Sequence, residues 1–371
     1  MRDALAERLL ATVMGWAADD VALERPDLQA MAMYKYDEYQ QFSPGMRFVE
    51  SLALWLSQFK TIQERQIAYR FVKRRLLFCS VAEINHLVSI AYPDYIRPHL
   101  LRSVAAEESL NPFHVGKVAA SRSFRVRQRQ CLFLGLSDGA RMDVFRRSNS
   151  SDVSHEQILQ TYEISAGRVN NLLGELRKDL KTILGADPEA DDQKFRTIVL
   201  LDDLSASGTS YLTKDDSGNL HGKIGTFYQS ITNPTDASAK LADLQKTEIL
   251  LVLYVATEKA VAHLKTLFEE IWNSVGARCR IVVVHTLSDA ICIADSGNDE
   301  MEPLLQTYYD ATIEDEHTRK GGKDVKHGFA GCGLPLVLSH NTPNNSVYLL
   351  WAESQRLRAL FPRVSRHRRD S

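Results

Sequence analysis

The sequence predicts an α/β protein in which a parallel sheet follows an N-terminal helical region. In the first ~125 residues, apolar side chains recur at the spacing of one helix face. Later segments are short apolar runs rich in Ile, Val and Leu, as in strands that are covered by helices on both sides. A helical segment separates two of these runs, which is the strand–helix–strand pattern of a parallel sheet.

The helical region is expected to form a subdomain that packs on another part of the protein. Its clearest helix shows in the apolar residues Phe48, Leu52, Trp55, Leu56 and Phe59. A second apolar face runs from Val81 to Ala91, and we expect that helix to end near Pro93 because proline disrupts a helix interior.

The expected strands begin with the short apolar run at residues 131–136 and continue to the C-terminal part of the chain. Further strands are expected at residues 197–201, 248–257, 280–287, 334–340 and 347–351. Residues 258–275 are predicted helical, as are residues 155–164 and 166–184.

Composition excludes several classes of protein. The 371-residue chain is 44% hydrophobic with a formal net charge of -2, so any nucleic-acid contact must come from a local patch. Its five cysteines include no CxxC pair, which argues against a disulfide framework and fits a reducing cytosol. No apolar run approaches the roughly 20 residues of a membrane helix. We therefore expect a cytoplasmic protein without a membrane segment.

The segment TIVLLDDLSASGTSYL, residues 197–212, runs from an apolar strand into two carboxylates and a loop of hydroxyls. In an open α/β sheet, ligands bind beyond the carboxyl ends of the strands, which is where Asp202 and Asp203 fall. The small residues that follow offer hydroxyls and successive N–H groups, which can cradle a phosphate. These features indicate a sugar-phosphate site, with the acids on ribose hydroxyls or on a hydrated Mg²⁺ ion.

This segment resembles the phosphoribosyl pyrophosphate (PRPP) loop of type I phosphoribosyltransferases. The shared pattern is an apolar strand, an Asp-Asp pair, three residues and then small–Gly–x–Ser/Thr. The resemblance implies that Asp202 and Asp203 face ribose and act in catalysis and metal binding. It also implies that phosphate is held by the loop residues Ser205, Ala206, Ser207, Gly208, Thr209 and Ser210. Ser207 stands where threonine is common, and Thr209 where a second glycine is common. The alternative is an ordinary strand end with acids in a solvated turn.

The segment CLFLGLSDGARMD is predicted to form a strand, a tight turn and a helix. Type I transferases carry a pyrophosphate-binding loop in this role, so the resemblance assigns it to Ser137, Asp138, Gly139, Ala140 and Arg141. Glycine lets the backbone approach an anion, and arginine can donate two hydrogen bonds to a phosphate. Taken alone, an unremarkable strand–helix turn explains the segment equally well.

Three segments together resemble the phosphoribosyltransferase-like domain of bacterial conflict systems, over about residues 45–362. They are GLSDGARMDVFRRS, LLDDLSASGTSY and LPLVLSHNTPNNSVYLLW. From this resemblance, together with the apolar pattern and the basic composition of the last residues, we expect a helical region at residues 1–121, a phosphoribosyltransferase-like α/β core at residues 122–362 and a basic tail at residues 363–371. Members occur in phage-defence gene neighbourhoods, some beside retron reverse transcriptases, and are proposed as effectors. A reverse transcriptase with its nucleic acid is therefore an expected partner, and the tail is a candidate contact.

Two functions stay open at this stage. One is an enzyme that binds PRPP or a related nucleotide with Mg²⁺ and transfers or cleaves at the anomeric carbon. The other is a nucleotide-sensing module that kept the loop and lost catalysis. One feature favours the second, because type I transferases have a further strand and a mobile loop where residues 143–184 are predicted almost entirely helical. The first, an enzyme-like effector, is nevertheless the function that we expect. The acceptor, the trigger and the oligomeric state, a homo-oligomer included, are not determined.

Two further segments are candidates for the site. Residues 215–219 are turn formers between two short arms, which predicts a hairpin, and Lys223 on its return arm could reach a phosphate. A solvent-facing lysine is the commoner case.

The segment SHNTPNNS follows a predicted strand, so we expect it at the same sheet edge as the acidic pair. There Asn341, Asn344 and Asn345 would read the edge of a base, and His340 would act as a general acid or base. The alternative is an asparagine-rich turn whose amides bond to their own backbone.

Overall fold

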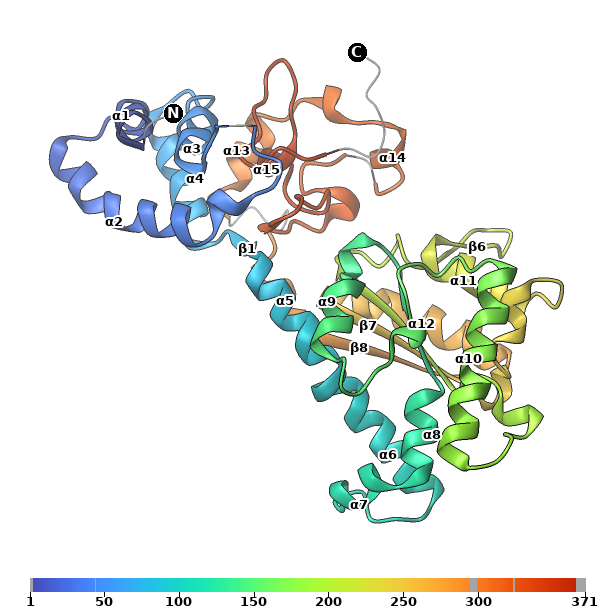
Figure 1. Cartoon of the computed structure of the whole chain (residues 1–371). Helices are drawn as coiled ribbons and strands as arrows, with labels where there is room; N and C mark the ends of the chain where they lie inside the picture. Colours follow the sequence, from blue (N-terminus) through green and yellow to red (C-terminus); the bar gives the residue numbers. More distant parts are fainter. Residues whose placement is uncertain (1–2, 44, 294–298, 323, 365–371) are drawn as a thin grey trace. The chain divides into compact units, whose positions relative to one another are not determined.

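The computed structural model describes residues 3–43, 45–293, 299–322 and 324–364 (Figure 1). The chain forms two compact units. Unit 1 comprises Met1–Glu83 and Ser288–Ser371, and unit 2 comprises Ile84–Leu287. The expected boundary between residues 121 and 122 thus falls inside unit 2, and the segment expected to form one α/β core contributes to both units. Within the described residues, no helix is long and apolar enough to cross a membrane.

Unit 2 contains a five-stranded parallel sheet in the order β3-β2-β4-β7-β8. Its strands are β2 (Cys131–Gly135), β3 (Ile158–Leu159), β4 (Thr197–Ser205), β7 (Glu248–Thr257) and β8 (Arg278–Leu287). Every residue of β2 and β7 is buried, and so are the first six residues of β4. This burial is the physical reason that these strands are continuous apolar runs rather than alternating ones.

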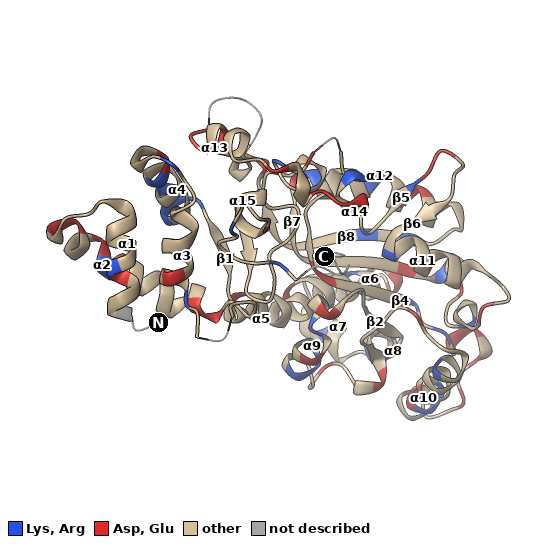
Figure 2. Ribbon diagram, turned by 90° about the horizontal axis from the view of Figure 1, so that it is seen from above, with Lys and Arg blue, Asp and Glu red and all other residues tan. Residues whose placement is uncertain are grey.

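Helices cover this sheet, and several of them share one apolar core. They are α5 (Val81–Ile90, which crosses the unit boundary), α6 (Arg97–Glu107), α7 (Val115–Ala120), α8 (Arg122–Arg129), α9 (Met142–Ser148), α10 (Ala166–Leu184), α11 (Gly222–Thr232) and α12 (Glu258–Ser274). Leu176 of α10, Phe227 of α11 and Trp272 of α12 belong to one buried cluster with the sheet residues. Basic and acidic residues are interspersed on α10 (Figure 2), in agreement with the near-neutral charge of the chain.

Unit 1 joins the two ends of the chain through a two-stranded parallel sheet, in which β1 (Leu77–Cys79) pairs with β9 (Leu336–Leu338). Its helices are α1 (Asp3–Met14), α2 (Ala18–Tyr34), α3 (Phe48–Leu56), α4 (Ile62–Arg74), α13 (Glu302–Thr307), α14 (Glu316–Arg319) and α15 (Tyr348–Trp351). The Trp55 indole donates to the Leu349 carbonyl at 2.8 Å, and the Ser51 hydroxyl donates to the Leu360 carbonyl at 2.7 Å. Buried polar contacts therefore fasten the C-terminal segment to α3.

Two local predictions were wrong. Residues 155–164 do not form a helix but a 3₁₀ turn (His155–Gln157) and the two-residue strand β3. Residues 347–351 form the short helix α15, since a short buried apolar run does not distinguish strand from helix. The α-helix from Val81 ends at Ile90, close to Pro93 as expected, and a π-helical turn (Ala91–Ile96) then carries the chain into α6.

The predicted strand at residues 334–340 exists only as the three-residue β9. It pairs with β1 in unit 1 and not with the five-stranded sheet of unit 2. The expectation that SHNTPNNS follows a strand of the main sheet was therefore wrong.

Candidate functional site

The candidate site lies at the carboxyl ends of β2 and β4. These strands are adjacent and parallel, with Gly135 opposite Leu201. Ser137 follows the end of β2, and Asp202 and Asp203 lie near the end of β4. The register thus brings together the two loops that the sequence resemblance assigned to pyrophosphate and to PRPP.

Asp202 is completely buried and bonded through both carboxylate oxygens. Oδ1 accepts a hydrogen bond from the Ser137 hydroxyl, and Oδ2 lies 2.5 Å from the Lys223 ammonium. Burial raises the pKa of Asp202, and the neighbouring Asp203 charge raises it further, whereas Lys223 and Ser137 oppose the rise. Ser137 and Lys223 therefore compensate a carboxylate that would otherwise be costly to bury.

Asp203 is partly exposed and lies against the loop that follows β2. Its Oδ1 accepts a hydrogen bond from the Leu204 N–H at 2.8 Å. A Cβ added at Gly139 would overlap the Asp203 carboxylate, so the loop approaches this closely only because residue 139 has no side chain. The glycine at this position therefore makes room for the Asp203 carboxylate.

Lys223 reaches Asp202 because of the turn that begins α11. The predicted hairpin is confirmed, with β5 (Thr213–Lys214) antiparallel to β6 (Leu220–His221). Gly222 has φ +89°, and a Cβ there would lie 2.6 Å from the Tyr211 carbonyl oxygen. The close approach places Lys223 in the first turn of α11, with its ammonium 4.9 Å from the centre of the Tyr211 ring. Lys223 is thus not a solvent-facing lysine, and it contacts Asp202 directly.

The loop after β4 is compact. Gly208 has φ +81°, and a Cβ there would lie 2.8 Å from the His263 ring of α12. The hydroxyls of Ser207 and Thr209 lie 2.9 Å apart, and the Thr257 hydroxyl donates to the Ala206 carbonyl at 2.7 Å.

Within the described part of the chain, some hydrogen-bond donors of this loop have no acceptor. The main-chain N–H groups of Gly208 and Ser210 donate no hydrogen bond there, and the buried Ser205 hydroxyl has no partner there. Unused N–H groups in a glycine-containing turn are the donors that an anion-binding loop requires.

The loop after β2 is bonded to strand β7 by a residue that the sequence pattern did not single out. The hydroxyl of Tyr254, in the buried strand β7, donates to the Ala140 carbonyl at 2.8 Å. Arg141 has φ +46°, and its guanidinium donates to the Asn85 side-chain oxygen at 3.4 Å. Asp138 is exposed at the tip of the turn. The only sequence signal for Tyr254 is a hydroxyl in an otherwise apolar strand, since a buried tyrosine hydroxyl usually has a partner.

His340, Asn341, Asn344 and Asn345 belong to unit 1, whereas the acidic pair belongs to unit 2. The side-chain Oδ1 of Asn341 accepts from the main-chain N–H groups of Thr342 and Val364, and the side-chain amide of Asn345 donates to the Phe329 carbonyl at 3.1 Å. These bonds are those of a turn that satisfies its own backbone, the alternative considered from the sequence. A base-reading role for these residues stays a prediction.

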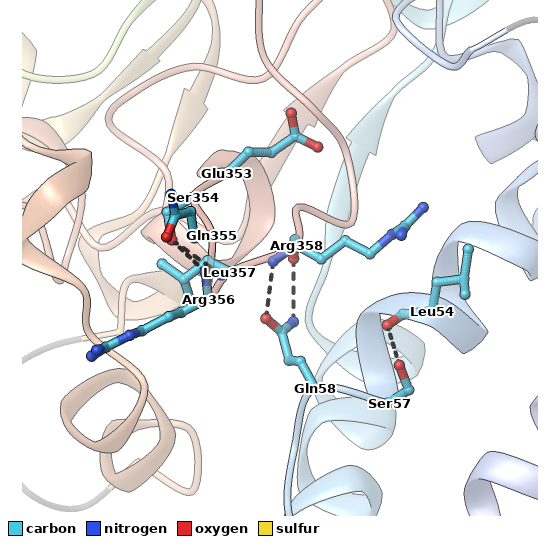
Figure 3. A pocket seen from close by; sticks show the side chains of 9 residues that line it. All are labelled: Leu54, Ser57, Gln58, Glu353, Ser354, Gln355, Arg356, Leu357 and Arg358. Carbon is cyan, nitrogen blue, oxygen red and sulfur yellow. Dashed lines mark hydrogen bonds between the residues drawn. The ribbon is translucent and has the colours of Figure 1, made fainter. Parts of the chain in front are cut away.

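Unit 1 also contains a cavity of about 530 Å³ between the end of α3 and residues 353–358. Figure 3 shows the side-chain amide of Gln58 bonded to the main chain of Arg358, by contacts of 3.2 Å in both directions. The guanidinium groups of Arg356 and Arg358 point away from each other in this view. The cavity therefore lacks a set of polar groups that converge on one point, and we do not assign it a ligand.

The parallel sheet, the acidic pair at its carboxyl edge and the two loops beside it define a phosphoribosyltransferase-like α/β protein. The family model PRTase-CE matches residues 52–363, and the chain belongs to this family. Neither a curated protein nor a solved structure matches the chain.

Proposed function

We propose that unit 2 binds PRPP or a related ribose phosphate at the carboxyl edge of β2 and β4. One observation carries the proposal: the loop after β2, through Ser137 and Gly139, and the start of α11, through Lys223, meet on Asp202 and Asp203. A ribose phosphate brings hydroxyls for the acids and phosphates for the unused N–H donors of the loop after β4.

The residues fit a Mg²⁺ ion that is carried largely by the substrate. Among the described residues, no cluster of three or more His, Cys, Asp or Glu side chains could hold a metal. Both oxygens of Asp202 already accept hydrogen bonds and Asp202 is completely buried, whereas Asp203 is partly exposed, so we expect Asp203 to be the acid that faces such an ion. Mg²⁺ commonly uses one or two carboxylates together with water and substrate phosphates. Bound there, it would offset the charge of the pyrophosphate group.

As an enzyme, the site would support transfer of the phosphoribosyl group. The bond between C1 of ribose and the pyrophosphate oxygen breaks, and pyrophosphate leaves with the electron pair. The acceptor forms the new bond to C1 and releases its proton to water. Arg141 would hold the leaving group, and Asp203 would stabilise the positive charge that develops on ribose.

A nucleotide-sensing module is the second candidate. Two observations favour it: Asp202 is already paired with Lys223, and β3 is a strand of only two residues between the two loops. A domain with these features could bind a nucleotide without turnover.

The setting that we propose is the cytoplasm of a bacterium, where the protein serves as an effector of a retron-type anti-phage system. A reverse transcriptase with its nucleic acid is the proposed partner, and self-association is compatible with this role. Of the basic tail at residues 363–371, only Arg363 and Val364 lie within the described residues.

Calorimetry with PRPP and Mg²⁺, followed by an assay for released pyrophosphate, tests the proposal. Asp203→Asn should weaken binding or turnover at least tenfold, whereas Asp216→Asn, an exposed acid in the hairpin turn, should change neither. Turnover that is lost in the Asp203 variant supports the enzyme, and binding without turnover supports the sensor. If neither PRPP nor a mononucleotide binds, the proposed function is wrong.

A further inference from the structure

A second concave site lies at the opposite end of the sheet of unit 2. It is a cavity of about 500 Å³ between α6 and β8, lined by His99, Arg102, Ser103, Ala106, Glu107, Arg278 and Arg280. Arg278 is the first residue of β8 and pairs in register with Glu248, the first residue of β7. Since Asp202 lies five residues after the partner of Glu248, the two sites are about 16 Å apart along the strands.

Three arginines converge on this cavity. Arg278 and Arg280 are two residues apart and therefore lie on the same face of β8. Arg102 and His99 are three residues apart and share a face of α6.

None of these arginines forms an ion pair with an acidic side chain within the described residues. Glu107, the acid in the wall, pairs instead with Arg127 at 2.8 Å. Glu248, which lies opposite Arg278, offsets part of this charge, so the cavity carries net positive charge although the whole chain has a formal net charge of -2.

Arg280 is held in place by two residues behind it. Its Nη1 lies 3.5 Å from Nδ1 of His99, and Nε2 of His99 lies 2.9 Å from Oε2 of Glu248. A guanidinium can only donate, so Nδ1 accepts and Nε2 carries the proton that is donated to Glu248.

Glu248 is buried and remains a carboxylate. Burial alone would raise its pKa, but the hydrogen bond from His99 and the nearby arginines outweigh burial, and the pKa is lowered. A fixed acid thus orients His99, and His99 in turn orients Arg280. Arg280 is therefore held in one orientation, whereas a solvated surface arginine has no such fixed partners.

We propose that this cavity binds a molecule that carries two or more linked phosphate groups. Its volume is in the range of small-molecule sites, and arginine is well suited to phosphate because its planar guanidinium donates in pairs. Three arginines match the charge of a diphosphate or triphosphate. A single concavity between one helix and one strand favours a small ligand over a nucleic acid, which would need an extended strip of positive charge.

The full chain can be titrated with tripolyphosphate and with inorganic phosphate by calorimetry, without Mg²⁺. Tripolyphosphate should bind at least tenfold more tightly than inorganic phosphate. Each of Arg102→Gln, Arg278→Gln and Arg280→Gln should weaken tripolyphosphate binding at least tenfold. Arg280→Lys should also weaken it, because lysine keeps the charge but loses the paired donors that His99 orients.

Two control variants distinguish tripolyphosphate binding in this cavity from binding at other arginines. Arg177→Gln, which removes an exposed arginine of α10, should leave tripolyphosphate affinity unchanged. Arg141→Gln removes an arginine of the proposed PRPP site, so tripolyphosphate affinity that is lost in this variant belongs to that site, and the affinity that remains belongs to the cavity. This test can therefore fail while the proposed function stands, and the reverse is equally possible. Unchanged melting temperatures show that the variants fold.

Three results would overturn the proposal. The first is the absence of tripolyphosphate binding, and the second is equal affinity in the wild type and in all three glutamine variants. The third is tighter binding of a single-stranded oligonucleotide than of tripolyphosphate, with a salt dependence of the affinity that corresponds to more than three ionic contacts. That result would assign the arginines to a nucleic-acid surface.

Discussion

Gly139 packs directly against the carboxylate of Asp203, and any side chain at residue 139 would overlap it. This contact joins the loop after β2 to the end of β4, two segments that are more than sixty positions apart in the chain. The hydrogen bond from Ser137 to Asp202 joins the same two segments, to which we assign the ligand.

Gly139→Ala should therefore displace the loop. We expect a loss of about 1–3 kcal/mol in the free energy of unfolding, together with weaker PRPP binding, because the added methyl group must push Asp203 aside. Urea denaturation and calorimetry measure the two effects. Gly167→Ala is the matched control, since a Cβ there meets open space on helix α10, and it should stabilise the protein by roughly 0.5–1 kcal/mol. An alanine at residue 139 with wild-type stability and affinity would show that the contact is absent in solution.

Lys223→Met should leave Asp202 buried without its cation. At pH 8 we expect a loss of about 3–5 kcal/mol in the free energy of unfolding, as for other broken buried ion pairs. Because burial raises the pKa of Asp202 in the folded state, stability falls as pH rises from its ordinary pKa through the raised one. The methionine raises that pKa further, so the loss should be smaller at pH 5 than at pH 8.

The control for this variant is Lys214→Met, which removes an exposed pair with Glu270. It should change stability by less than about 1 kcal/mol at either pH. A loss in Lys223→Met that does not depend on pH would contradict the assignment of Lys223 as the counter-ion of Asp202.

Tyr254→Phe should remove the hydrogen bond that ties the loop after β2 to strand β7. The Ala140 carbonyl would lose its buried donor, at an expected cost of about 1–3 kcal/mol in the free energy of unfolding. The pKa of Tyr254 is raised well above its usual value, mainly by burial, so the hydroxyl stays protonated and the cost should not vary between pH 6 and pH 9. Tyr228→Phe, at a partly exposed position, should cost less than about 0.5 kcal/mol. Equal stabilities for the two variants would argue against the contact.

Tyr39→Phe tests how unit 1 holds the C-terminal segment. The Tyr39 hydroxyl contacts Thr342 Oγ1 at 2.9 Å and donates to the Pro362 carbonyl at 2.7 Å, and both contacts would be lost. We expect a loss of about 1–3 kcal/mol in the free energy of unfolding. Burial raises the pKa of Tyr39 to about 12, so the difference from wild type should stay constant below about pH 10 and shrink above it. Tyr34→Phe, at an exposed position, should have no measurable effect.

Local sequence pattern was sufficient for the long elements and for the acidic loop. The run at residues 248–257 became β7 with the expected bounds, because a strand buried on both faces must be apolar throughout. The turn formers at residues 215–219 predicted the hairpin, because residues that favour tight turns between two short arms are a local signal. Short elements escaped prediction: β3 has only two residues and is fastened by the Gln157 amide, which donates to the Cys131 carbonyl at 2.9 Å.

The sequence by itself determined the fold class, the family resemblance and the segment that carries the two aspartates, because these depend on the order of residue types along the chain. The tertiary structure alone decided which residues meet. It paired Asp202 with Lys223, set Gly139 against Asp203, assigned residues 334–351 to unit 1 and gathered three arginines at the far end of the sheet. The physical reason is that such contacts depend on strand order and register, which bring together residues that no local pattern connects.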